Sequence, residues 1–269
     1  MIQGGIMKHI FAVCAYKDSP YLPDCLDSLE RQTSPSPILL CTATPSPRLT
    51  ELARERGLSL RVNDQKPNIA GDWNFAMAQA RAEGADYVTL CHQDDLYLPD
   101  YGASFRKAAK AESDLLIYFT DYGEQRGNDV IASSRLLNIK RLLLWRMRIH
   151  PWQTNSLMKH RTLALGDPIC CPSVTYNLNR LTLPLFEPGM STNLDWQTWE
   201  RLALQEGRFY YDRSVLMLHR IHPDSTTSQV LGKGGRTAQD EAMFRKFWCA
   251  PIASVLTRLY AGSEKSNNL

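Results

Sequence analysis

Short apolar runs alternate with amphipathic stretches over roughly the first 92 residues of the chain. Four runs predict strands that are buried on both faces: 10–15, 38–42, 58–62 and 86–91. Between them, apolar residues recur at helical spacing, which predicts three helices: 21–32, 49–56 and 70–83. Gly57 and Gly84 follow the last two of these, where glycine commonly ends a helix. Strands and helices that alternate in this order form a parallel sheet, so the predicted fold class is α/β.

The remainder of the chain is less regular. It predicts helices over 101–111, 194–206 and 237–260, a strand over 114–120 and one or two strands over 209–221. Residues 135–150 stand apart, because they combine large apolar side chains with five cations and no acidic residue. The cations are Arg135, Lys140, Arg141, Arg146 and Arg148. Two interpretations stay open: a helix that packs residues 136, 139, 143 and 147 on the core, or a helix on an anionic lipid surface.

Composition and charge narrow the class of protein further. The chain has 269 residues, 43% of them hydrophobic and 22% charged, which is enough for an ordinary globular core. Its 31 Lys and Arg against 28 Asp and Glu leave a net charge of +3, too small for a protein that coats nucleic acid. Seven cysteines without a Cys-x-x-Cys motif favour a reducing, cytoplasmic location, and Cys170 and Cys171 are expected to be buried packing thiols. The N-terminus lacks a signal-peptide pattern, and no run approaches the ~20 apolar residues of a membrane-spanning helix.

The candidate chemistry lies at the end of the fourth predicted strand, which reads His92-Gln93-Asp94-Asp95. In an open parallel sheet, ligands bind beyond the carboxyl ends of the strands. Two adjacent carboxylates repel each other, and a divalent cation relieves that repulsion. Mg²⁺ and Mn²⁺ prefer carboxylate oxygens together with phosphate oxygens and water, so Asp94 and Asp95 are candidate metal ligands. The alternative is that the two residues only cap the turn that follows the strand.

Five strings of residues, taken in order, resemble the family 2 glycosyltransferases, which use nucleotide-sugar donors and have the GT-A fold. The strings are 12–17 with 21–33, then 68–76, 92–95, 195–199, and 220–222 followed by 225–227. The resemblance covers roughly residues 8–228. It implies a GT-A domain over 1–228, a Rossmann-like, mostly parallel sheet flanked by helices, with a nucleotide-binding half at about 8–100 and an acceptor half at about 101–228. Residues 229–269 are then a helical C-terminal extension.

The resemblance also implies roles for particular residues. Asp195 is the expected general base, and a carboxylate in the first turn of a helix that begins near Thr192 or Asn193 also favours the helix dipole, so the two interpretations are compatible. The expected donor-binding residues are Tyr16, Asp18, Thr42, Asp72, Asn74, Gln93 and Arg220. The expected ligands of Mn²⁺ or Mg²⁺ are Asp94, Asp95 and His222.

Strand alternation places Arg220 and His222 on one face, with His219 turned away in a structural role. The sequence also departs from the family pattern at two places. Cys41-Thr42 stands where the family has Asp at the end of the second strand, and His92 stands where the metal motif begins with Asp. These departures leave the base of the nucleotide donor open.

The expected function is that of a metal-dependent, inverting glycosyltransferase of hexosyltransferase type. It would move a sugar from a nucleotide-diphosphate donor, a UDP-sugar, to a glycan or lipid-linked acceptor in surface polysaccharide synthesis. The alternative is a catalytically silent sugar-nucleotide-binding protein of the same fold. A nucleotidyltransferase would need a Gly-rich, basic loop after the first strand, and residues 16–20 do not form one. The expected location is cytoplasmic, with peripheral contact to the inner face of the membrane as the second interpretation of 135–150, and no nucleic-acid partner is expected.

Overall fold

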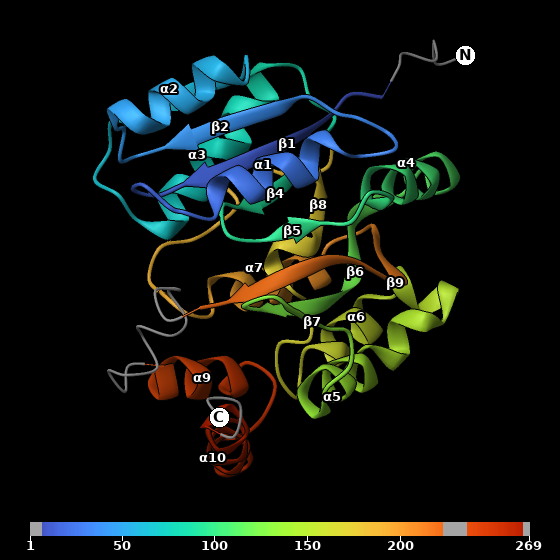
Figure 1. Ribbon diagram of the computed structural model, residues 1–269. Coiled ribbons are helices and arrows are strands. Elements are labelled where there is room, and N and C mark those ends of the chain that lie inside the picture. The colour runs from blue at the N-terminus through green and yellow to red at the C-terminus, as the bar shows by residue number, and fades with distance from the viewer. Residues whose placement is uncertain (1–6, 223–235, 266–269) are drawn as a thin grey trace.

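The computed structural model describes residues 7–222 and 236–265 of the chain. Within these residues a nine-stranded sheet runs through the centre in the order β3-β2-β1-β4-β8-β6-β9-β5, with β7 paired to β6 (Figure 1). The strands are β1 His9–Ala15, β2 Ile38–Thr42, β3 Ser59–Val62, β4 Tyr87–His92, β5 Leu96–Tyr97, β6 Leu115–Arg126, β7 Asp129–Ile131, β8 Val174–Asn177 and β9 Arg208–Ile221.

Helices cover the sheet and extend below it. They are α1 Leu22–Glu30, α2 Pro47–Glu55, α3 Ile69–Ala82, α4 Tyr101–Ala111, α5 Arg135–Leu143, α6 Ser156–Thr162, α7 Leu194–Ala203, α9 Arg236–Arg245 and α10 Ala250–Lys265. Three short 3₁₀ helices complete the description: η1 Leu144–Arg148, η2 His150–Gln153 and η3 Cys171–Ser173.

The first seven elements confirm the predicted alternation of strands and helices. The Ser46 side chain accepts a hydrogen bond from the Leu49 amide at 3.0 Å, and Asn68 caps α3 in the same way through the Gly71 amide at 2.8 Å. Side chains of consecutive strand residues point to opposite faces, and in β1 Phe11 and Ala12 are both fully buried. A strand packed on both faces is therefore apolar at successive positions, which is the pattern that predicted it.

The direction of the strands determines which residues meet at one edge. Strand β1 is parallel to β2 and β4, and β2 is parallel to β3. Strand β8 is antiparallel to both β4 and β6, whereas β9 is again parallel to β6. The carboxyl ends of β1, β2, β4 and β9 consequently share one edge of the sheet, and in Figure 1 the arrowheads of β1, β2 and β9 point to the left. The sequence left open whether 209–221 holds one strand or two, and it forms the single strand β9.

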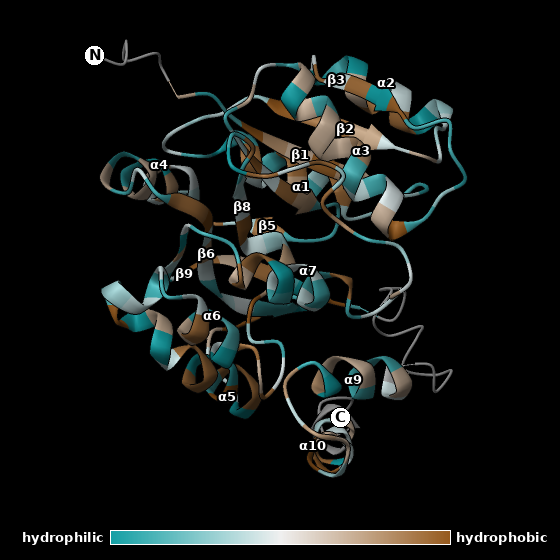
Figure 2. Ribbon diagram, turned by 180° about the vertical axis from the view of Figure 1, so that it is seen from behind, coloured by the Kyte–Doolittle hydropathy of each residue, from teal (hydrophilic) through white to brown (hydrophobic). Residues whose placement is uncertain are grey.

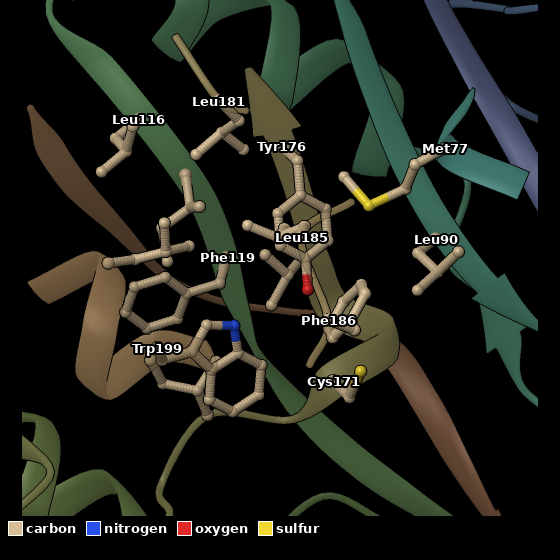
Figure 3. Packing of buried hydrophobic residues seen from close by; sticks show 14 of the residues in the cluster. Met77, Leu90, Leu116, Phe119, Cys171, Tyr176, Leu181, Leu185, Phe186 and Trp199 are labelled. Carbon is tan, nitrogen blue, oxygen red and sulfur yellow. The ribbon is translucent and has the colours of Figure 1, made fainter. Parts of the chain in front are cut away.

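The core on one face of the sheet centres on Tyr176 of β8, which is fully buried (Figure 3). Figure 3 shows Met77 and Leu90 to one side of the Tyr176 ring and Phe119 and Trp199 to the other. Trp199 comes from α7, so this helix is anchored on the sheet through its apolar face.

The C-terminal helices pack directly on the rest of the molecule. The Trp196 ring of α7 lies 5.1 Å from the ring of Phe244 in α9 and 5.9 Å from that of Tyr260 in α10. The indole N–H of Trp248 donates to the Ala164 carbonyl at 2.6 Å. A helical C-terminal segment is thus confirmed, and it contacts α7 closely. The expected boundary at residue 228 and the motif residues 225–227 lie outside the described residues.

Residues 135–153 form α5 followed by η1 and η2, and their packing differs from the predicted core helix. Leu137, Leu144 and Met147 are buried, whereas Ile139 is 41% exposed and Leu142 66% exposed. The expectation that position 139 faces the core is therefore wrong, because α5 turns Leu137 to the core and Ile139, two residues on, lies about 200° further round the helix. In the part of the chain that the structure describes, no helix is long and apolar enough to cross a membrane.

We expect the free energy of unfolding to fall in mild acid because of His9. Its ring is fully enclosed, with Nδ1 2.8 Å from Ser36 Oγ and Nε2 2.8 Å from Thr89 Oγ1, and burial, aided by the charge of Arg106, lowers the pKa of His9 to about 3. The folded protein therefore excludes a proton that the unfolded chain binds near pH 6.5. This contribution is complete above pH 6.5 and is lost as the pH falls toward 3, which amounts to about 2 kcal/mol at pH 5.

Urea unfolding of the wild type and of His9→Gln at pH 7.5 and pH 5 measures this contribution. Other groups titrate in both proteins, so the prediction concerns the difference between the two pH dependences. Stability of the His9→Gln variant should change less between the two pH values than stability of the wild type. Parallel pH dependences would contradict the prediction.

Candidate functional site

The acidic pair lies in the turn that follows β4, and Asp95 is its buried member. The side chain of Asp95 is fully enclosed, and its Oδ1 lies 2.8 Å from His219 Nδ1. The backbone N–H of Arg220 donates to the same oxygen at 2.9 Å. Asp95 therefore joins the end of β4 to the end of β9, two segments that lie 124 residues apart in the sequence. The sequence placed His219 on the opposite face in a structural role, and in the structure it bonds the buried Asp95, whereas Arg220 and His222 reach Asp94.

Asp94 is the more accessible carboxylate of the pair. Its Oδ2 lies 2.9 Å from His222 Nε2, and the Arg220 guanidinium donates to the Asp94 carbonyl at 2.9 Å. Burial opposes ionisation of Asp94, but the nearby charge of His92 and the hydrogen bond from His222 outweigh it, so the pKa of Asp94 lies below its ordinary value. For His219, burial opposes protonation, and the carboxylate of Asp95 outweighs it and raises the His219 pKa. Asp94 is thus held as an anion among imidazoles.

The donor atoms at the end of β4 fit a divalent cation. His92, Asp94 and Asp95 each offer one ligand atom, and these atoms lie within 4.8 Å of one another. Two buried atoms in this group, His92 Nε2 and Asp95 Oδ2, make no hydrogen bond within the described part of the chain. The indole of Trp73 stacks on the His92 ring at 5.2 Å and fixes its plane. Carboxylate oxygens with an imidazole nitrogen are a suitable set for Mn²⁺ or Mg²⁺, and His92 was not among the predicted ligands.

Gln93 connects this turn to the loop that follows β1. Its amide oxygen accepts from the Tyr16 N–H at 2.9 Å, and its amide nitrogen donates to the Tyr16 carbonyl at 3.0 Å. The Tyr16 ring itself is 50% exposed at the carboxyl edge of the sheet. Lys17 has a φ of 56°, and its N–H donates to Thr44 Oγ1 at 2.6 Å. The two loops are therefore held together, and an exposed aromatic ring stands beside the acidic pair.

The other predicted donor-binding residues make contacts within the protein. Asp18 accepts a hydrogen bond from Ser46 Oγ at the start of α2, and the buried hydroxyl of Thr42 accepts from the Thr44 amide at 3.0 Å. Asp72, whose pKa is raised by burial, accepts from the Asn63 amide group at 2.9 Å. These three side chains therefore order the loops around β2 and β3.

Asn74 and Arg220, two further predicted donor-binding residues, each make several contacts within the protein. Asn74 Oδ1 accepts from the amides of Leu185 and Phe186, each at 2.8 Å, and its Nδ2 donates to the Phe186 carbonyl at 2.7 Å. The Arg220 guanidinium donates to Asp24 at 3.0 Å and lies 4.6 Å from the centre of the Tyr21 ring. Asn74 thus holds the 185–186 loop, and Arg220 holds the backbone of the acidic turn against α1.

Asp195 lies in the first turn of α7, as predicted. The start of this helix is held in place by residues of α9. The Oδ1 atom of Asp195 accepts from the Trp196 amide at 2.8 Å. Asn193, at the N-cap position, donates to Asp240 of α9 at 2.8 Å and makes no capping bond with its own helix. The Oε1 atom of Gln239 in α9 accepts from the amides of Ser191 and Thr192 and from the Thr192 hydroxyl. The sequence carried no signal for this support from α9.

The pKa values of the Cys170 and Cys171 thiols respond to the charges of both Asp195 and Asp95. Both thiols are buried, as predicted, and burial raises both pKa values well above the ordinary range. The charges of Asp95 and Asp195 each raise them further, so both carboxylates lie within electrostatic range of the same two thiols.

These features define a class of protein: an α/β sheet with a cation-compatible acidic turn and an exposed aromatic ring at its carboxyl edge. The family model described as Glycosyl transferase family 2 matches residues 11–178, more than half of the chain. The chain therefore belongs to glycosyl transferase family 2. A search of curated proteins finds no match.

Solved structures show that the fold is the GT-A fold. TarS of S. aureus superposes with a TM-score of 0.59 at 14% identity, covering 90% of this chain and 43% of its own. The mannosyltransferase PcManGT of Pyrobaculum calidifontis, in complex with GDP-Man and Mn²⁺, gives 0.64 at 14% identity, with 94% and 69% covered. Glucosyl-3-phosphoglycerate synthase of Mycobacterium tuberculosis, with Mn²⁺ and UDP-Glc, gives 0.55 at 17% identity, with 94% and 79% covered. This chain thus spans less than half the length of the TarS chain.

We expect Gln239→Ala to loosen the first turn of α7. The substitution removes the acceptor of three donors at 191 and 192, and lost partners of this kind cost about 1–2 kcal/mol. Amide hydrogen exchange of residues 196–199 should accelerate by roughly five- to thirty-fold. Glu241→Ala, which removes an ion pair on the surface of the same helix, is the matched control. Equal exchange in the two variants would show that Gln239 does not support α7.

Proposed function

We propose that this protein is a metal-dependent, inverting glycosyltransferase of hexosyltransferase type. It transfers a sugar from a nucleotide-diphosphate donor to a hydroxyl of a glycan or lipid-linked acceptor, in surface polysaccharide synthesis on the cytoplasmic side of the membrane. The observation that carries the proposal is the acidic turn after β4. Its two carboxylates are bonded by His219 of β9 and by His222 directly after it, and two buried donor atoms there have no hydrogen bond among the described residues.

Four residues would hold the cation: Asp94, Asp95, His92 and His222. When bound, a divalent cation neutralises the negative charge that grows on the departing nucleotide diphosphate. The chain's own part is to keep Asp94 ionised and the ligands in place. Asp94 is kept anionic by the neighbouring imidazoles, and Arg220 fixes the backbone of the turn through the Asp94 carbonyl. Asp95 would bind the cation through its Oδ2 atom, because its Oδ1 atom already accepts two hydrogen bonds.

Asp195 is the proposed general base. The acceptor hydroxyl must lose a proton as it attacks the anomeric carbon, and a carboxylate on a rigid mount accepts that proton efficiently. Its mount is rigid because α9 holds the residues immediately before α7. One base and one displacement imply inversion of configuration at the transferred sugar.

Tyr16 is the residue best placed to meet the donor base. Its ring is half exposed while its backbone is held at both polar atoms by Gln93. Asp18 borders the same loop, and the Thr42 hydroxyl at the end of β2 orders the turn beside it. Structural relatives are described in complex with UDP-GlcNAc, UDP-glucose and GDP-mannose, so the donor base varies within this fold. We propose a UDP-sugar as the first donor to test.

The second candidate is a catalytically silent sugar-nucleotide-binding protein, favoured by Thr42 and His92 at positions where the family pattern has Asp. Incubation with UDP-glucose, UDP-GlcNAc or GDP-mannose in the presence of Mn²⁺ separates the two. An active transferase releases the nucleotide diphosphate slowly without acceptor and faster with one. A silent protein binds the nucleotide and releases nothing.

We expect Asp94→Asn to abolish cation-dependent binding and turnover. The substitution removes the accessible negative charge of the turn but keeps the size of the side chain. Isothermal titration with Mn²⁺ and UDP should lose the Mn²⁺-dependent gain in UDP affinity. Asp129→Asn, on an exposed position of β7, is the control with the same change of charge. Full turnover by Asp94→Asn, or by the wild type in excess EDTA, would rule out a metal at this site.

We expect Asp195→Asn to lower kcat by about 10²- to 10⁴-fold, the usual contribution of a general base. Donor affinity should stay close to that of the wild type, because Asp195 lies on α7 and not on the donor loops. Steady-state kinetics and UDP titration report the two quantities separately. A variant that loses donor affinity and keeps kcat would assign Asp195 to binding.

A further inference from the structure

The charge of this chain is distributed unevenly. Residues 130–166 carry seven Lys and Arg and no Asp or Glu, whereas the chain as a whole has 31 basic and 28 acidic residues. This segment therefore has a charge of +7 and the rest of the chain one of −4. A segment of that kind is an electrostatic footprint for an anionic partner.

The structure divides these cations into internal and external ones. Arg141 donates to Asp121 at 3.2 Å and to the Ala132 carbonyl at 2.8 Å, and Lys159 donates to the carbonyls of Gln205 and Gly207. Arg135 and Arg148 are exposed, and Arg146 is half-buried with its guanidinium 4.7 Å from the centre of the Trp145 ring. The last three are therefore the cations of α5 and η1 that can reach a partner.

Large apolar side chains share this surface with the cations. Ile139, Leu142, Trp145 and Ile149 are 41%, 66%, 41% and 36% exposed. Ile139 and Leu142 lie on α5, Trp145 on η1 and Ile149 directly after η1, so the exposed apolar residues follow one another along this segment. Figure 2 shows brown, hydrophobic ribbon on α5 at the lower end of the molecule, where α10 also lies. We call Arg135, Ile139, Leu142, Trp145, Arg146, Arg148 and Ile149 the α5–η1 surface.

We propose that the α5–η1 surface docks on a bilayer that contains anionic lipid. A nucleic-acid surface would match the cations but gives Leu142 and Ile149 nothing apolar to contact. A lipid surface matches both, because exposed leucine and tryptophan enter the headgroup boundary while arginines contact lipid phosphates. The Trp145 ring, next to Arg146 and 5.5 Å from Trp152, has the amphipathic character of residues at a membrane interface.

Docking in this way leaves the candidate site accessible. In Figure 1 the α5 helix lies at the lower right of the molecule, with α10 to its lower left, whereas the strand arrowheads that mark the carboxyl edge point to the left. A bilayer on the outer side of α5 would therefore face a different side of the molecule from the site. The proposal does not depend on transferase activity, since lipid binding needs neither donor nor cation.

Co-sedimentation of the full chain with two kinds of vesicle tests the proposal. One kind is phosphatidylcholine alone and the other is phosphatidylcholine mixed with phosphatidylglycerol. We expect binding to the anionic vesicles only, weakened by added salt. Replacement of Arg135, Arg146 and Arg148 by Gln should weaken it on the order of a hundredfold, from the usual attraction of a basic residue near anionic lipid. Arg31, Arg48 and Arg54 replaced by Gln change the net charge equally at exposed positions outside this surface, and should change binding little.

A second measurement locates the contact. Brominated lipid in the anionic vesicles should quench tryptophan fluorescence in the wild type, and Trp145→Phe should remove most of the quenching while co-sedimentation persists. Equal weakening by both triple substitutions, or binding to neutral vesicles alone, would overturn the proposal. So would binding to heparin or RNA without lipid quenching, or a dimer in analytical ultracentrifugation that Leu142→Ser dissociates. Each of these outcomes leaves the transferase proposal untouched.

Discussion

Burial of the Asp95 carboxylate is the constraint on which the arrangement of the site depends. A carboxylate with no exposed surface is tolerated only when partners compensate its lost hydration, and removing them costs several kcal/mol. The partners here are the His219 ring and the Arg220 amide, both near the end of β9. Strand β9 must therefore end beside β4. Once it does, Arg220 and His222 reach Asp94 in the same turn, so one buried charge assembles the whole acidic cluster.

Strand β9 also connects the site to the α5–η1 surface. At its start, Arg208 donates to the His150 carbonyl of η2 at 3.0 Å, and in its middle the Tyr211 hydroxyl donates to Asp121 at 2.6 Å. Asp121 accepts in turn from Arg141 of α5. Strand β9 is a stiff element because it is hydrogen-bonded to β6 along its length. Its start contacts η2 and its end contacts the acidic turn after β4.

The sequence predicts the first half of the fold well and the site only in part. Strands β1 to β4 and helices α1 to α3 were predictable because capping residues, glycines and apolar runs are local signals. His219, Trp73 and Gln239 were missed because their partners lie far along the chain and no local pattern indicates such contacts. Ile139 was assigned to the core from its helical spacing to 136 and 143, but spacing alone does not decide which side of a helix is buried, and α5 buries Leu137. Asn74 and Thr42 show the reverse case, in which motif residues make contacts within the protein.

These internal contacts determine how much freedom the donor loops keep. Gln93, Thr44 and Ser46 hold the loop after β1 at three points, through Tyr16, Lys17 and Asp18. The carboxylate that the family pattern has at the end of β2 would carry a charge where Thr42 places a buried hydroxyl. A hydroxyl satisfied by its own turn adds order to that turn without a charge, so the proposed recognition of the donor base relies on the exposed ring of Tyr16. The turn after β4 keeps both carboxyl groups, and the hydrogen bonds between Gln93 and Tyr16 fix the loop that carries the Tyr16 ring relative to that turn.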